Sequence, residues 1–159
     1  MAYNAKNILQ LNALGQLFQM EFTDKIREEQ GGTYGVRVHQ EAEKLPKEGF
    51  TLQFQFDADP VRRAQLVEAM NKVTTGLQQK GPDAKMLEKV KEYMLKQHTD
   101  NLKENGYALR NMWQYYVYGI DNEKDYVKYV NDLSVETMRQ FTNQLLGQNN
   151  RVEVSMTSK

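Results

Sequence analysis

An arginine and a tyrosine flank a pair of adjacent glycines in the first quarter of the chain. Arg27 precedes Gly31 and Gly32, and Tyr34 follows them. A guanidinium fork and a phenol hydroxyl are hydrogen-bond donors suited to a carbonyl group or an oxyanion. A helical pattern before the glycines and a strand pattern after them predict a tight turn that brings both side chains to one side. We interpret these four residues as the candidate binding site of the chain.

The same residues also have purely structural interpretations. Tyr34 shares the alternation of Val36 and Val38, so the pattern fits a half-buried core tyrosine at least as well. Pairing with a neighbouring glutamate would account for Arg27. Glycine accepts the left-handed backbone that ends a helix, which would account for Gly31 and Gly32. The pattern alone leaves these alternatives open.

Other catalytic chemistries are restricted by residue types that are scarce. The chain has no cysteine, which excludes disulfides, thiolate zinc sites, iron–sulfur clusters and a cysteine nucleophile. His39 and His98 are too far apart in sequence for the HExxH or inverted HxxEH zinc helix. We interpret both as solvated histidines and not as ligands, and Glu28 and Glu29 as a solvated helix end. The sequence therefore predicts no metal site within this chain.

The length of the chain favours a single domain, and its balanced charge gives no indication of a strongly charged partner. The chain has 159 residues, and 21 basic residues balance 21 acidic ones. Nucleic-acid binding needs a basic surface, and no part of the chain is strongly basic. No apolar run approaches the ~20 residues that span a bilayer, and no signal-peptide pattern is present. We expect neither a nucleic-acid nor a membrane partner, and the compartment stays open between periplasm and cytoplasm.

Hydrophobic periodicity predicts the elements of the first half of the chain. Apolar residues at three- and four-residue steps predict a helix over residues 4–28. Strict alternation predicts two strands, over residues 34–39 and 50–56, joined by an exposed loop. Asp59 and Pro60 have the composition of a helix start, and the helix that follows should end near Gly81.

The second half of the chain is predicted to be mainly helical. Helices are expected from Asp83 to about residue 105, over 107–118, around 122–130, and from Ser134 to Gly147, followed by a strand over 152–156. The order α-β-β-α-α-α-α-α-β predicts an α+β domain, in which one antiparallel sheet carries helices on one face. Three strands provide little sheet for so many helices, so we expect residues 1–159 to be one domain excised from a longer polypeptide, without an upstream strand.

Four stretches together resemble a known family. They are Ile26 to Val36, Phe50 to Pro60, Gly81 to Lys91, and Glu104 to Tyr107. In this order they are similar to the C-terminal domain of the insulinase/pitrilysin family of zinc metallopeptidases, and to domains of mitochondrial processing peptidase. The similarity extends over essentially the whole chain.

The resemblance implies a division of labour between two halves of a metallohydrolase-like clamshell. In the family, the N-terminal half carries zinc on the inverted HxxEH helix. The C-terminal half, which lacks this helix, contributes an arginine and a tyrosine to an extended peptide. Arg27 and Tyr34 keep the family's spacing of seven, with Gly31 and Gly32 between them. The partners implied are the N-terminal half of the same parent protein and a peptide substrate.

The first hypothesis is therefore that the chain is the substrate-binding half of a bacterial zinc endopeptidase. Two further hypotheses remain open. Some members of the family are non-catalytic, so the chain could belong to a structural or partner-binding member of the same fold. An unrelated α+β interaction domain is the third hypothesis, which a structure without helices on one face of a sheet would favour.

Overall fold

A long N-terminal helix forms the centre of the molecule. The computed structural model describes residues 1–28, 35–148 and 150–156. Helix α1 (Ala5–Phe22) is capped by the side chain of Asn4, and it continues directly into a π-helix, η1 (Thr23–Glu28). The predicted helix over 4–28 is confirmed, although its last turns are wider than those of an α-helix. Helix α1 is buried on several sides, so it lies within the core and not on its surface. Its fully buried apolar residues are Leu11, Ala13, Leu14, Leu17, Phe18 and Phe22.

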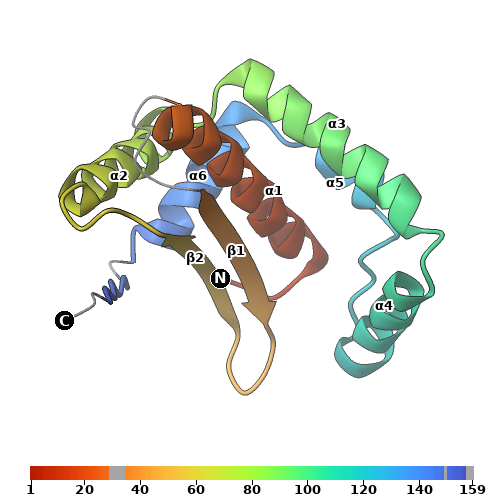
Figure 1. The fold of residues 1–159 in the computed structure, drawn as a ribbon. Helices are drawn as coiled ribbons and strands as arrows, with labels where there is room; N and C mark the ends of the chain where they lie inside the picture. Colours follow the sequence, from red (N-terminus) through yellow and green to blue (C-terminus); the bar gives the residue numbers. More distant parts are fainter. Residues whose placement is uncertain (29–34, 149, 157–159) are drawn as a thin grey trace.

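Two antiparallel strands pack on α1. Strand β1 (Val36–Glu43) pairs with β2 (Gly49–Phe56) in the register Val36 to Phe56. One face carries the apolar residues of both strands and meets α1 (Figure 1). There, the ring of Phe54 lies 4.8 Å from that of Phe18 and 4.9 Å from that of Phe22. The other face is polar and exposed, which is the pattern predicted for strands with one buried side.

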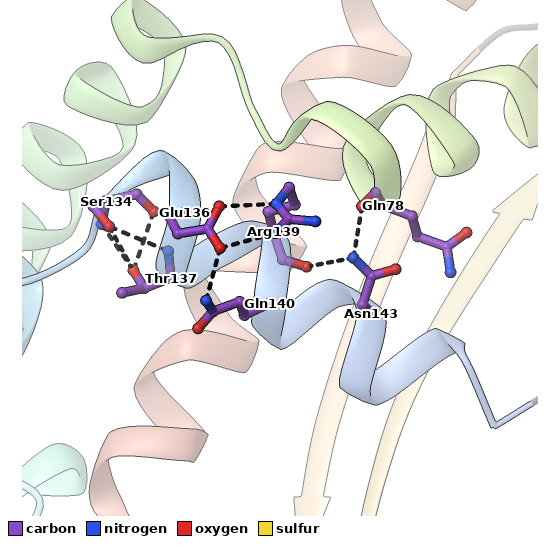
Figure 2. A network of polar contacts seen from close by, with 7 residues as sticks. All are labelled: Gln78, Ser134, Glu136, Thr137, Arg139, Gln140 and Asn143. Atoms are coloured by element: carbon purple, nitrogen blue, oxygen red, sulfur yellow. Dashed lines mark hydrogen bonds and ion pairs between the residues drawn. The ribbon is translucent and has the colours of Figure 1, made fainter.

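Helices α2 (Arg63–Lys80) and α6 (Val135–Leu146) pack against each other beside α1. Figure 2 shows the polar residues of α6. At the start of α6, the Ser134 side chain forms a reciprocal capping box with Thr137. Further along α6, the Asn143 side chain donates a hydrogen bond to the backbone oxygen of Gln78 in α2 at 2.6 Å. Gly81 ends α2 with φ of 76°, as predicted. The Asp59 carboxylate accepts from the amide of Val61, but the helix begins only at Arg63.

The remaining helices run along and beyond α1. Helix α3 (Ala84–Asn101) is followed by α4 (Asn105–Tyr118) and the short α5 (Tyr126–Asn131). Helix α5 lies beside α3, whereas α4 extends from the end of α3 away from the other helices (Figure 1). Gly106, which lies between the helices predicted to end near residue 105 and to begin at 107, is in the first turn of α4.

The predicted class is confirmed: an antiparallel sheet carries helices on one face. The predicted C-terminal strand is wrong, because residues 151–156 form neither helix nor strand. The alternating Val152, Val154 and Met156 are 84%, 82% and 94% exposed. Alternation predicts a strand only where another strand is available to pair with it, and among the described residues β1 and β2 pair only with each other.

Candidate functional site

In sequence, the predicted binding residues belong to the end of η1 and to the segment between η1 and β1. The backbone of Arg27 belongs to η1, while its side chain lies outside the described part of the structure. Gly31, Gly32 and Tyr34 also lie outside the described residues. Short π-helices are rare and occur frequently at functional sites. The position of η1 immediately before this segment is therefore notable.

Gln19 fixes the place where β1 begins. Its amide nitrogen donates to the backbone oxygen of Val36 at 2.8 Å, and its amide oxygen accepts from the backbone nitrogen of Val38 at 3.1 Å. One side chain thus satisfies a donor and an acceptor on the edge of β1 that faces away from β2. Thr23 at the start of η1 lies 3.4 Å from the same amide nitrogen. Gln19 consequently joins α1, η1 and β1 beside the predicted site.

A polar hollow of about 480 Å³ lies next to this junction, on the exposed face of the hairpin. Arg37 is paired across the strands with Gln55, and His39 with Gln53, so four polar side chains stand on one surface. The side chain of Gln19 and Val38 complete the lining. These groups offer hydrogen-bond donors and acceptors of the kind that recognise polypeptide backbone. His39 is exposed, as predicted.

The described residues do not form a metal site. No three His, Cys, Asp or Glu side chains within 1–28, 35–148 and 150–156 gather as possible ligands. A zinc ion held only by this part of the chain therefore has no fitting donor set. Among the described helices, none combines the length and the apolar character that a membrane-spanning helix requires.

Sequence reasoning missed a second polar cluster, centred on Glu123. One carboxylate oxygen accepts from the Tyr107 hydroxyl at 2.6 Å and from the Asn111 amide at 2.7 Å. The other lies 2.8 Å from Nε2 of His98. Burial, together with Glu123, raises the pKa of the Tyr126 phenol to about 12. Burial and the hydrogen bond to the same carboxylate also raise the pKa of Tyr107. The cluster joins α3, α4 and the segment before α5.

The interpretation of His98 as a solvated side chain is wrong. Its side chain is 11% exposed, and its ring is stacked on that of Tyr126 with centroids 4.1 Å apart. One feature of the sequence could have predicted that His98 faces the core. His98 continues the four-residue spacing of the buried stripe that contains Val90 and Met94.

The fold and the site define an α+β domain with a polar sheet surface and, in its described part, no cluster of metal ligands. The chain belongs to the family described as "Peptidase M16 inactive domain", whose model matches residues 1–94. The match confirms the resemblance to the inactive domain of this peptidase family, and it includes the segment that contains Arg27 and Tyr34. No curated protein sequence matches the chain significantly.

Several solved structures share the fold. The periplasmic protease PqqL from Escherichia coli aligns with a TM-score of 0.76 at 17% identity, over 92% of this chain and 16% of that chain. The ferredoxin protease FusC, solved in complex with Arabidopsis ferredoxin, aligns with a TM-score of 0.70 at 17% identity, over 91% of this chain and 16% of that chain. A protease from Helicobacter pylori aligns with a TM-score of 0.71 at 16% identity, over 87% of this chain and 34% of that chain. The chain thus spans about a sixth to a third of these proteins.

Proposed function

We propose that this chain is the substrate-binding C-terminal half of a zinc-dependent endopeptidase, with zinc and the catalytic base in an N-terminal half of the same polypeptide. The observation that carries the proposal is the match to the inactive M16 domain across the Arg27–Tyr34 segment. The absence of a metal-ligand cluster from the described residues is consistent with it. On this proposal, residues 1–159 are one domain that is inert alone.

Arg27 and Tyr34 have separate roles in the proposal. The guanidinium of Arg27 holds a backbone carbonyl of the substrate by charge-assisted hydrogen bonds. The Tyr34 hydroxyl donates to the oxyanion that develops at the scissile carbonyl. Gly31 and Gly32, which carry no Cβ, would allow a tight turn of the chain between these two residues. Zinc bound in the other half would supply the activated water.

The polar hollow on the exposed face of the hairpin would be a second contact surface for the substrate. Arg37, Gln53 and Gln55 would face the backbone of an extended peptide, which carries regularly spaced donors and acceptors. The polar side chains around the hollow fit segments of unfolded polypeptide that are bound through their backbone. FusC, which was solved with ferredoxin, shows that a protein of the same fold can bind a protein chain.

The test is peptide cleavage by the polypeptide that contains both halves. Arg27→Ala and Tyr34→Phe should each lower kcat/KM by about tenfold or more without lowering the melting temperature, because each removes a hydrogen bond to the reacting peptide. The matched controls are Arg151→Ala and Tyr93→Phe, at exposed positions that do not belong to the predicted site, and both should cleave like the wild type. Unchanged kinetics in Arg27→Ala and Tyr34→Phe would remove the site assignment.

Zinc content separates this function from the non-catalytic alternative. The complete polypeptide should bind one zinc ion and cleave peptides, whereas the 159-residue chain alone should do neither. A complete polypeptide without zinc or cleavage would indicate a structural or partner-binding member. Tight zinc binding by the isolated chain would contradict the proposal.

A further inference from the structure

Helix α4 is oriented with its polar side toward the protein and its apolar side outward. Its partly buried residues recur at steps of four, three and four, so they occupy one face, and none of its residues is fully buried. They are Tyr107, Asn111, Gln114 and Tyr118. The opposite face carries large apolar side chains that are 50% to 78% exposed. They are Leu109, Met112, Trp113 and Tyr116. A surface helix normally has the reverse arrangement.

Specific contacts hold α4 in this orientation near both ends. At its start, Tyr107 and Asn111 donate to the carboxylate of Glu123. Toward its end, Gln114 accepts from the hydroxyl of Tyr3 at 3.0 Å, and the ring of Tyr118 meets that of Tyr3 edge-on at 5.7 Å. The outward direction of the apolar face is therefore fixed by contacts made on the opposite side of the helix.

The outward face has almost no charge. Within α4 the only ionised side chain is Arg110, whose guanidinium carbon lies 6.0 Å from the ring centre of Tyr107. Four large apolar side chains on consecutive turns form an exposed patch of the kind that marks a protein contact. An apolar surface gains most from a partner that is also apolar, because water is then removed from both. Nothing on this face offers charge complementarity.

We propose that the outward face of α4, defined by Leu109, Met112, Trp113 and Tyr116, packs against an apolar surface of another domain in the same polypeptide. This inference rests on the proposed function, in which a second half lies in the same polypeptide. The solved proteases of this fold have chains three to six times as long as the matched part, so further domains are covalently linked to it there. Covalent linkage gives such a domain a high effective concentration at this face.

The experiment places the photo-crosslinker p-benzoylphenylalanine at position 116 of the complete polypeptide. After irradiation, peptide mapping should find position 116 joined to residues outside 1–159 of the same molecule. The matched control carries the crosslinker at position 93, where Tyr93 on α3 is 47% exposed. It should give at most a trace of that product. A crosslink between two copies, or none, would overturn the inference.

Matched substitutions test whether the face itself drives the contact. Leu109→Glu places a carboxylate in the apolar contact and should lower the yield of the crosslink from position 116 by about fivefold or more. Leu102→Glu makes the same change at another exposed leucine, off the patch, and should leave the yield unchanged. The isolated chain should melt at the same temperature with either change, because both leucines are more than half exposed. Equal yields from the two variants would overturn the inference.

Peptide cleavage by the crosslinker-labelled protein separates this inference from the proposed function. Cleavage without an intramolecular crosslink would overturn the docking face and leave the peptidase function intact. A crosslink without cleavage would support the docking face while the peptidase function fails.

Discussion

The hydroxyl of Tyr107 donates a hydrogen bond to Glu123 at 2.6 Å and ties the first turns of α4 to the segment before α5. Glu123 also contacts Asn111 of α4 and His98 of α3, so one carboxylate joins three parts of the chain. Near its other end, α4 is held by Tyr3, which contacts Gln114 and Tyr118. The orientation of the first turns of α4 therefore depends strongly on the Glu123 carboxylate.

Glu123→Gln should destabilise the chain. An amide keeps one acceptor oxygen, but its nitrogen cannot accept a hydrogen bond as the second carboxylate oxygen does. Hydrogen bonds to a charged group are worth about 1.5–3 kcal/mol. The Glu123 side chain is 32% exposed, so we expect a loss near the lower end of this range, measured by urea unfolding. Glu92→Gln, on the exposed side of α3, is the control. Equal unfolding midpoints for the two variants would contradict the role of Glu123.

Tyr126 should make the chain sensitive to alkaline pH. Its pKa is raised to about 12 in the folded protein, mainly by burial, against an ordinary value of 10. The unfolded state therefore loses the phenol proton first, so the stability linked to this group is complete below pH 10 and is lost as the pH rises toward 12. Tyr126→Phe keeps the ring stacked on His98 and removes the titration.

The wild type should accordingly lose stability relative to Tyr126→Phe between pH 10 and 12, as measured by chemical unfolding at each pH. Tyr116→Phe, on the exposed face of α4, should follow the wild type. A constant difference between wild type and Tyr126→Phe across this range would show that the buried phenol does not control the loss.

Gln19→Glu should detach the outer edge of β1 from α1. The amide donates to the carbonyl of Val36 and accepts from the amide of Val38. A carboxylate would place a second oxygen against the Val36 carbonyl, leaving an acceptor unsatisfied at a cost of about 1–3 kcal/mol. Hydrogen exchange at the Val38 amide should become faster, and the melting temperature should fall.

The control is Gln16→Glu, which makes the same change about one turn earlier on α1. Gln16 is partly buried, as Gln19 is. Exchange at Val38 should be unaffected by the control. Equal acceleration in both variants would indicate that added charge on α1 is the cause, and not the lost contact with β1.

Local sequence patterns correctly predicted the elements that form without a specific partner distant in sequence. The α1 stripe, the alternation of the hairpin and the helix stop at Gly81 each depend on residues close in sequence. The C-terminal strand failed because alternation at residues 152–156 gives no information on whether another strand lies beside it. The Glu123 cluster was missed because its members are 12 to 25 positions from the carboxylate. The Arg27 and Tyr34 site stays a prediction.

Gly81, which ends α2, and Gly76, within α2, should respond in opposite directions to replacement by alanine. Gly81 ends the helix at φ 76° and ψ −178°, a conformation that is essentially restricted to glycine. A Cβ there would lie 2.8 Å from the backbone oxygen of Val135, at the start of α6. Gly81→Ala should therefore destabilise the chain by about 1–3 kcal/mol from backbone strain, and further by pushing α6 from α2.

Gly76 is the matched control within the same helix. A Cβ at this position would meet no atom within 4 Å, so alanine adds helix propensity without a clash. Gly76→Ala should stabilise the chain by up to about 1 kcal/mol. Urea unfolding midpoints should thus move down for Gly81→Ala and up for Gly76→Ala. Shifts of the same sign would mean that the conformation at Gly81 and its close approach to Val135 do not determine how α2 meets α6.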